Sequence, residues 1–273
     1  RNSGLTTVQK ENCYYNLFFM THEGQYDNMN AFFRTNGYDE VFSLEDYPAD
    51  KVVNSFGVQD DFLYDYAIPV LNQRAATGQP FFATLLSISN HPPYVIPPFF
   101  HPKTSEPETQ IVEYADWALR QFFEEARKQP WFDNTIFVLE GDHGKLVGDA
   151  ECELPESYNH IPLMIYSSRI QPEEKTTFGG QVDIQPTILG LLNIDYLQNN
   201  FGVDLLKEER PCMFYTADNM VVGRNDTLLY LYNYETQQEL TYDIGNGKLN
   251  AVPMDDSFLP LKEYSFSMLQ SAE

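Results

Sequence analysis

The sequence predicts an α/β fold with a mostly parallel central sheet, helices on both faces of that sheet, and a small antiparallel β element at the carboxyl end. Strand-like and helix-like stretches alternate in the first part of the chain. The strand-like runs are apolar throughout, as expected of parallel strands covered on both faces. From about Met213 the runs become short and are separated by turn residues, which is typical of an antiparallel hairpin or meander.

The elements of the α/β part follow from apolar runs for strands and helical spacing of apolar residues for helices. The first predicted helix ends at Asn36-Gly37, a common carboxyl-terminal stop, and the last has Pro186 in its first turn. In chain order we expect a strand at residues 14–20, helices at 27–35 and 60–76, a strand at 81–88, a helix at 108–129, strands at 135–139 and 161–166, and a helix at 183–192.

The antiparallel part is predicted from three short runs, residues 220–224, 228–233 and 239–243. Their boundaries are turn residues, and their lengths suit the strands of a meander. We therefore expect two domains, an α/β domain at residues 1–212 and a small β element with a carboxyl-terminal tail at 213–273.

The net charge of −23 argues against nucleic acid or an anionic membrane surface as the main partner. An anionic substrate would need a local cation, and a bound divalent metal would supply one. No apolar run reaches the roughly 18 residues that a membrane span needs. The chain begins at Arg1 and reaches a strand-like run within a dozen residues, so we expect it to be a piece of a longer protein.

The segment Asn134-Thr-Ile-Phe-Val-Leu-Glu-Gly-Asp-His-Gly is the most informative motif of the chain. A run of β-formers leads to Asp142 and His143, on a turn flanked by Gly141 and Gly144. Open α/β sheets carry their active sites at the carboxyl ends of strands. A carboxylate and an imidazole suit Zn²⁺ or Mn²⁺. The alternative for this motif is a polar turn after a core strand.

Two further histidines follow predicted strands. His91 comes after the strand at 81–88, and His22 after the strand at 14–20. Titratable groups at several strand ends on one sheet edge predict a functional site more strongly than one group alone. The alternative for His91 is a loop histidine next to a proline turn. His101 and His160 are expected to have structural roles.

Other common catalytic motifs are absent from the sequence. It contains no Gly-rich phosphate loop, no Ser-centred nucleophile elbow and no EF-hand loop. Asp183 opens a predicted helix, where capping is the expected role of a carboxylate. Cys13 lacks the downstream Pro and Arg of a modified catalytic cysteine. No nucleophile is predicted within the chain.

These motifs together resemble the sulfatase-like branch of the alkaline phosphatase superfamily, and most closely its lipoteichoic acid synthase and phosphoglycerol transferase group. The resemblance covers nearly the whole chain and rests on an ordered series of segments, namely residues 18–40, 81–94, 113–123, 134–144, 157–168 and 181–194.

The resemblance implies a role for each candidate residue. Asp142 and His143 match the metal-binding Asp-His pair of that family, whose ion is commonly Mn²⁺; Zn²⁺, Mg²⁺ and Ca²⁺ are the alternatives. His91 matches the histidine that binds substrate phosphate, and His22 matches a further histidine expected at the substrate. The family's acidic metal ligand and nucleophilic Thr belong to upstream segments, so this chain would hold part of an active site and would be inactive alone.

The activity implied is metal-dependent phosphoryl or phosphoglycerol transfer, or phosphodiester hydrolysis, on a lipid- or glycan-linked ester of the cell envelope. The Trp and Arg with which lipoteichoic acid synthases grip glycerol phosphate are missing around Asp27, Asn28 and Met29. A sulfatase and a non-catalytic binding module on the same fold are the alternatives. The resemblance also implies that this domain lies outside the cytoplasmic membrane and is tethered to it by amino-terminal transmembrane helices of the longer protein.

Overall fold

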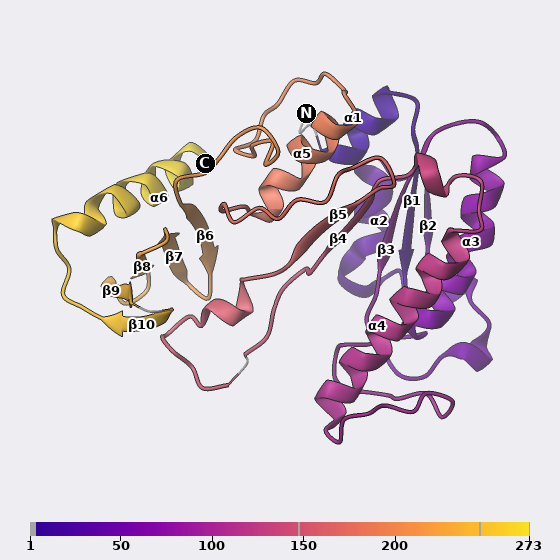
Figure 1. The fold of residues 1–273 in the computed structure, drawn as a ribbon, viewed down its shortest axis with the longest axis horizontal. Helices are drawn as coiled ribbons and strands as arrows, with labels where there is room; N and C mark the ends of the chain where they lie inside the picture. The colour runs from indigo at the N-terminus through magenta and orange to yellow at the C-terminus, as the bar shows by residue number, and fades with distance from the viewer. Residues whose placement is uncertain (1–3, 147, 246, 273) are drawn as a thin grey trace. The chain divides into compact units, whose positions relative to one another are not determined.

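A computed structural model describes residues 4–146, 148–245 and 247–272 (Figure 1). The chain divides into two compact units. The amino-terminal unit comprises Arg1–Thr135, Ser167–Arg169 and Tyr196–Asn199, and the carboxy-terminal unit comprises Ile136–Tyr166, Ile170–Asp195 and Asn200–Glu273.

The amino-terminal unit contains a three-stranded parallel sheet in the order β2-β1-β3. Leu17 of the central strand lies opposite Glu40 on one side and Ala83 on the other. The strands are β1 (Tyr15–Met20), β2 (Glu40–Phe42) and β3 (Phe81–Leu86); the α-helices of this unit are α1 (Leu5–Glu11), α2 (Met29–Thr35), α3 (Asp60–Ala75) and α4 (Pro107–Ala126).

Helices cover both faces of this parallel sheet. On one face the ring of Phe18 stacks on Phe33 of α2, with ring centroids 3.8 Å apart. On the other face Phe42 packs against Tyr66 of α3 at 5.8 Å. Because both faces are covered, Leu17 to Met20 of β1 are all buried. The α/β class with a parallel sheet between helices is therefore confirmed.

Helix α4 packs along α3 in the same unit. The buried Tyr114 of α4 donates a hydrogen bond from its hydroxyl to Oδ1 of Asp61 at 2.6 Å. Beyond the end of α4, the indole of Trp131 donates to Asn72 Oδ1 at 2.7 Å. These two contacts join α3 to α4 and to the segment that follows α4.

The carboxy-terminal unit begins with β4 (Phe137–Glu140), which pairs antiparallel with β5 (Leu163–Tyr166). The strand predicted at 161–166 is present as β5, but it is not buried as predicted, since Met164 is 55% exposed and Tyr166 39%. An apolar run predicts a strand but does not specify its partner. Here β4 and β5 form a two-stranded sheet of their own among the described residues.

A five-stranded antiparallel sheet in the order β10-β9-β8-β7-β6 follows, and it confirms the predicted meander. Its strands are β6 (Met213–Ala217), β7 (Met220–Arg224), β8 (Leu228–Asn233), β9 (Gln238–Gly245) and β10 (Lys248–Ala251); the α-helices of this unit are α5 (Ile184–Leu191) and α6 (Leu259–Ala272). The sheet starts at Met213, where the sequence predicts the second domain to begin. The division into domains at 212/213 stays a prediction.

Both faces of the meander sheet carry apolar clusters. Tyr230 packs with Phe258 and with Leu261 of α6. Leu154 packs with Val222 and with the cluster around it. The tail after Pro253 thus forms a helix that packs on the sheet.

Asp183 lies in a 3-10 turn (Gln181–Asp183) directly before α5 and is fully buried. Its carboxylate accepts the N–H groups of Gly180 at 2.9 Å and Val203 at 2.8 Å. It also forms an ion pair with the buried Arg210, at 2.6 Å. The Asp183 carboxylate thus caps the 3-10 turn through the Gly180 N–H, but it makes no capping bond to α5, and the partner Arg210 adds a tertiary contact.

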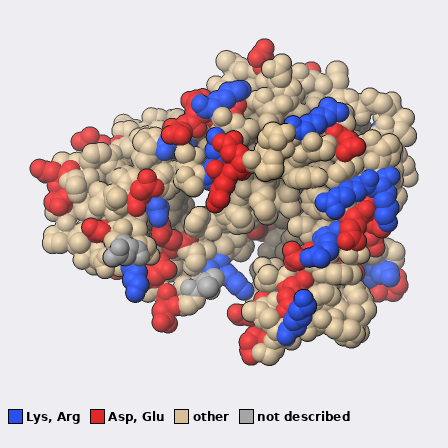
Figure 2. Space-filling model, viewed as in Figure 1, with Lys and Arg blue, Asp and Glu red and all other residues tan. Residues whose placement is uncertain are grey.

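Short 3-10 turns connect several elements, at Tyr26–Asn28, Leu44–Asp46, Ala49–Lys51, Phe132–Asn134, Glu156–Tyr158 and Asp256–Phe258. Acidic and basic side chains are interspersed on the face drawn in Figure 2, with more acidic than basic residues in the chain. None of the helices within the described ranges has the length and apolar character needed to cross a membrane.

Candidate functional site

His22 lies in the loop directly after β1. The residue is only 4% exposed, and its ring lies 4.9 Å from the ring of Tyr26. Its Nδ1 is 3.1 Å from the carbonyl oxygen of Glu23. Asp27 and Asn28 then adopt positive φ angles of 46° and 58°, conformations that cost energy for non-glycine residues.

A carboxylate from outside the loop holds the turn that follows His22. Both oxygens of Glu45 lie within hydrogen-bond distance of the Gly24 N–H, at 3.3 and 3.2 Å. Ser43 donates its hydroxyl to Glu45 Oε2 at 2.7 Å. The Ser43 hydrogen bond is the main reason that the pKa of Glu45 is lowered from its ordinary value, so this carboxylate is ionised and accepts hydrogen bonds.

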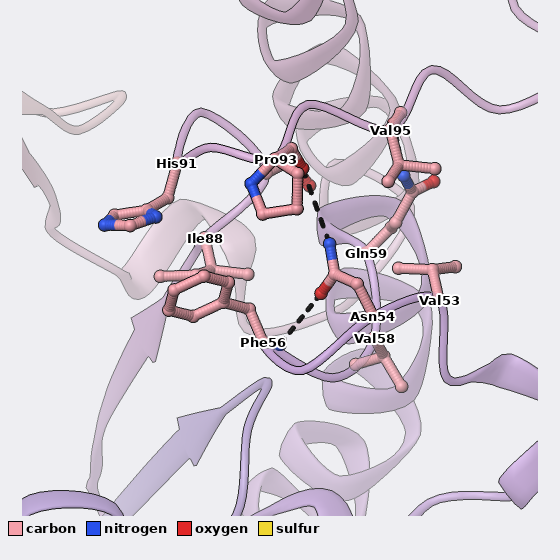
Figure 3. Close-up of a pocket in the computed structure, with 10 residues that line it drawn as sticks. Val53, Asn54, Phe56, Val58, Gln59, Ile88, His91, Pro93 and Val95 are labelled. Atoms are coloured by element: carbon pink, nitrogen blue, oxygen red, sulfur yellow. Dashed lines mark hydrogen bonds between the residues drawn. The ribbon is translucent and has the colours of Figure 1, made fainter.

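His91 lies in the loop after β3 and is exposed. Its Nδ1 is 2.8 Å from the carbonyl oxygen of Pro92. The ring of Phe56 packs against it with centroids 4.4 Å apart. Figure 3 shows the loop lying along residues 53–59, and the cavity between the loop and these residues measures ≈ 10 Å³. That is room for about one water molecule, so the side chains here pack together rather than forming a substrate pocket.

Residues 54–60 connect the two histidine loops of the amino-terminal unit. Val58 donates its N–H to the carbonyl of Thr21 at 3.2 Å, next to His22. Gly57 has φ +90°, and a Cβ there would lie 1.8 Å from the Thr21 oxygen. The structure therefore brings the His22 and His91 loops into contact with one shared segment.

Asp142 and His143 lie in the carboxy-terminal unit on the turn after β4. Their side chains are 72% and 67% exposed. Asp142 Oδ1 accepts the N–H of His143 at 2.9 Å, and Asp142 Oδ2 lies 3.8 Å from His143 Nε2. Gln181 donates to the carbonyl of Asp142 at 2.9 Å.

The two glycines that flank this turn are explained by close packing of residues 157–161. A Cβ at Gly144 would lie 2.0 Å from the Ser157 carbonyl oxygen, and a Cβ at Gly141 would lie 3.2 Å from Ile161 Cγ2. Gly144 also donates its N–H to the carbonyl of Tyr158 at 2.9 Å. Only glycine fits at position 144, whereas a larger residue at position 141 would require a small shift of the Ile161 side chain.

His22, His91 and His143 share one hydrogen-bonding pattern. In each, Nδ1 lies 2.7–3.1 Å from the carbonyl oxygen of the next residue. A carbonyl only accepts hydrogen bonds, so Nδ1 is the donor in each of these contacts and Nε2 is left to face another group. Within the described part of the chain, His101 and His160 form no such ring bond.

The Asp142–His143 pair fits part of a divalent metal site. Nε2 of His143 and Oδ2 of Asp142 lie 3.8 Å apart, and the Nδ1 contact to the Gly144 carbonyl orients the imidazole as outer-shell partners of metal ligands do. Two donors are fewer than the four or more ligands that Zn²⁺ or Mn²⁺ binds. Among residues 4–146, 148–245 and 247–272 no group of three or more such side chains is assembled.

The match to known proteins decides the family. The model of the sulfatase family matches residues 2–194, which is more than half of the chain. The chain belongs to the sulfatase family. The matched residues include the three histidine-bearing turns and Asp142.

Relatives of this sulfatase-family chain include lipoteichoic acid synthase 1 of Bacillus subtilis (strain 168). That protein is 27% identical over 243 residues, which cover 81% of this chain and 36% of the relative. The chain thus spans about a third of that relative's length.

Two solved structures share the fold. One is a protein in the alkaline phosphatase superfamily from Vibrio parahaemolyticus, with a TM-score of 0.84 and 27% identity, covering 97% of this chain and 66% of that one. The other is the lipoteichoic acid synthase LtaP from Listeria monocytogenes, with a TM-score of 0.82 and 22% identity, covering 98% and 72%. The resemblance to the alkaline phosphatase superfamily and its lipoteichoic acid synthase group is confirmed.

Sequence reasoning missed the residues that support the site. Glu45 and Asp60 bond to the loops of His22 and His91 across 21 to 29 residues of sequence. The sequence carries no local signal for such contacts. The sequence can predict a turn at Gly57, but it cannot predict the close approach of Gly57 to the Thr21 carbonyl.

Proposed function

We propose that this chain is part of an enzyme that uses a divalent metal to transfer a phosphoryl or phosphoglycerol group, or to hydrolyse a phosphodiester. The observation that carries the proposal is the convergence of the Asp142 carboxylate and Nε2 of His143, with Oδ2 and Nε2 3.8 Å apart. Membership of the sulfatase family and likeness to a lipoteichoic acid synthase support it.

Asp142 and His143 would hold the ion, with Mn²⁺ first among the candidates. A bound divalent ion neutralises charge on ester oxygens and lowers the pKa of an oxygen nucleophile. We propose that the remaining ligands and the nucleophile lie on segments outside this chain, which spans about a third of the length of lipoteichoic acid synthase 1.

His91 and His22 would act on the substrate phosphate. The exposed His91 presents Nε2, which accepts a proton from a hydroxyl or, once protonated, donates a hydrogen bond to a phosphate oxygen. His22 presents Nε2 from a buried position, which suits orientation of the phosphate more than exchange of protons with water. Residues 54–60 pack against both histidine loops. The position of one histidine therefore does not depend on a movement of the other.

The substrate class follows from the relatives. Lipoteichoic acid synthases are named for a lipid-linked polymer of the envelope, so we propose a lipid- or glycan-linked phosphate ester as substrate and a location outside the cytoplasmic membrane, with the longer protein anchored in it. The strong negative charge of the chain disfavours nucleic acid as a substrate.

Sulfate-ester hydrolysis is the second candidate, favoured by the match to the sulfatase family model. The longer protein decides between the two activities when it is assayed with Mn²⁺ against a phosphodiester, a phosphomonoester and an aryl sulfate. We expect metal-dependent phosphodiester cleavage that Asp142→Asn abolishes. Cleavage of the aryl sulfate alone would establish a sulfatase, and turnover retained by Asp142→Asn would contradict the assignment of the metal ligand.

A further inference from the structure

A buried carboxylate lies under the His91 loop. Asp60, the first residue of α3, is 2% exposed. Its Oδ1 accepts the N–H groups of Ile88 at 2.9 Å and Ser89 at 3.0 Å, and its own N–H donates to Ser89 Oγ at 3.1 Å. Three hydrogen bonds therefore join the start of α3 to the residues that connect β3 to His91.

This use of the carboxylate is not the one expected at a helix start. An acidic residue in the first turn of a helix ordinarily interacts with the free N–H groups of its own helix. Asp60 instead satisfies two N–H groups of a different segment. An N–H at a buried position such as Ser89 costs free energy if it is left without an acceptor, and a carboxylate is the strongest acceptor available to it.

Neighbours of Asp60 hold the other side of the same loop. Gln59 donates its side-chain amide to the carbonyl of Val95, and Asn54 donates to the carbonyl of Pro93 at 3.5 Å (Figure 3). The residues from Asn54 to Asp60 thus contact the His91 loop before and after the histidine. Among these contacts, the buried ones whose partners lie closest in sequence to His91 are those that Asp60 makes with Ile88 and Ser89.

We propose that Asp60 is a positioning residue for His91: by accepting the Ile88 and Ser89 N–H groups, its carboxylate fixes the loop that presents the His91 imidazole to a phosphate ester. The part of this proposal that concerns the ester rests on the proposed function. The positioning itself is a property of the chain and is measurable without any substrate.

Nuclear magnetic resonance of the ¹⁵N-labelled chain tests the positioning. We expect wild-type His91 to show the Nδ1–H tautomer and residues 88–93 to be rigid on the ps–ns timescale. Asp60→Ala removes the acceptor, so the tautomer preference of His91 should decrease and those amides should become mobile. Asp60→Asn keeps an oxygen acceptor at Oδ1 and should restore both signals.

Asp61→Ala is the matched control. Within the described ranges this neighbouring carboxylate bonds to Tyr114 and makes no hydrogen bond to the His91 loop, so its loss should leave the His91 signals unchanged. Should Asp60→Ala fold poorly, Ser89→Ala removes only the bond from the Asp60 N–H, and a smaller change of the same kind is expected. Unchanged His91 signals in Asp60→Ala, or in Ser89→Ala where Asp60→Ala does not fold, would overturn the proposal.

Activity of the longer protein separates this proposal from the proposed function. Misplacing a catalytic group by about 1 Å costs up to about 100-fold in rate, so Asp60→Ala should lower kcat by about 10- to 100-fold while Asp60→Asn stays within about threefold of wild type. A wild type that turns over no phosphate ester, with the His91 signals still altered in Asp60→Ala, would refute the function and leave the positioning intact. Equal kcat in Asp60→Ala and wild type would refute the role of Asp60 in presenting His91.

Discussion

The His91 loop and the Asp142–His143 turn both follow a strand and both hold a histidine through a contact from Nδ1 to the next carbonyl, yet the two loops are held differently. Side chains of a distant segment hold the His91 loop, above all the buried Asp60. The Asp142–His143 turn is held by close backbone packing at Gly144 and by one amide from Gln181. The comparison teaches that the position of His91 depends on hydrogen bonds to a buried carboxylate, whereas the positions of Asp142 and His143 depend on close backbone packing at a glycine.

The exposure of the two regions fits this difference. The carboxylate under the His91 loop is buried and satisfied by N–H groups, so it is unavailable to a ligand. The Asp142 carboxylate is 72% exposed and has one oxygen without a strong donor, so it remains accessible to a cation. Glycine substitutions therefore test the close backbone packing found in both regions, and substitutions of Asp60 test the buried carboxylate under the His91 loop.

Gly57→Ala should have the largest effect, because it acts on the segment that joins the two histidine loops of the amino-terminal unit. An alanine at φ +90° costs about 1–2 kcal/mol. The new Cβ would also lie 1.8 Å from the Thr21 carbonyl oxygen, and relieving that overlap costs a further ~1–3 kcal/mol. We expect chemical denaturation to show a loss of roughly 2–5 kcal/mol in the free energy of unfolding of this unit.

Gly78→Ala is the control for that loss. Gly78 has φ +77° but no atom within 4 Å of its would-be Cβ, so only the conformational cost of about 1–2 kcal/mol applies. Equal losses for the two variants would mean that the contact between Gly57 and Thr21 is not tight in solution.

Gly144→Ala tests the turn of the carboxy-terminal unit and should have an intermediate effect. Its Cβ would overlap the Ser157 carbonyl oxygen at 2.0 Å, and the turn must shift at a cost of about 1–3 kcal/mol. Since the shift moves Asp142 and His143, Mn²⁺ affinity measured by calorimetry should fall as well. Gly148→Ala, with no atom near its Cβ, should leave that affinity unchanged; the same affinity in both variants would argue against glycine packing as the support of the turn.

The smallest effect is the pH dependence of stability due to Asp60. Burial raises the pKa of this carboxyl above its ordinary value of 3.8 in spite of the N–H groups that bond to it. The folded state therefore binds the proton more tightly than the unfolded state, and the stabilisation from the protonated form is complete below pH 3.8 and is lost as pH rises through the folded-state pKa. The side-chain amide introduced by Asp60→Asn does not titrate, so that variant lacks this dependence.

The free energy of unfolding of wild type should accordingly fall relative to that of Asp60→Asn as pH rises from about 4. Denaturation of both proteins between pH 4 and pH 8 measures the difference, in which the other titrating groups cancel. A difference that is constant, or that changes in favour of the wild type with rising pH, would contradict a raised pKa for Asp60.

Local patterns predicted much of the fold. The apolar spacing that predicted a helix at 60–76 corresponds to α3, Asp60–Ala75, and the short runs after Met213 correspond to the meander strands. The pairing of β4 with β5 was not predictable from their apolar runs, because hydrophobicity sets burial only when a partner covers the strand. The antiparallel pairing of β4 with β5 and the exposure of one face are set by the tertiary structure and not by the local sequence.

The sequence predicts the candidate site as a set of residues but does not predict the contacts that hold them. His22, His91, Asp142 and His143 follow strands, and this local feature marks them. Their supports do not share it. Asp60 reads as an ordinary acidic residue at a helix start, and only the fold reveals that its acceptor oxygen serves residues 28 and 29 positions away.

The most direct test of the central claim, that Asp142 and His143 bind a divalent cation, is Mn²⁺ titration of the ¹⁵N-histidine-labelled chain. Paramagnetic Mn²⁺ broadens the signals of imidazoles near it. We predict that the His143 ring signals broaden first, that the exposed His101 in the amino-terminal unit is unaffected at the same concentration, and that Asp142→Asn removes the broadening. Equal broadening of His143 and His101, or broadening that persists in Asp142→Asn, would contradict the claim.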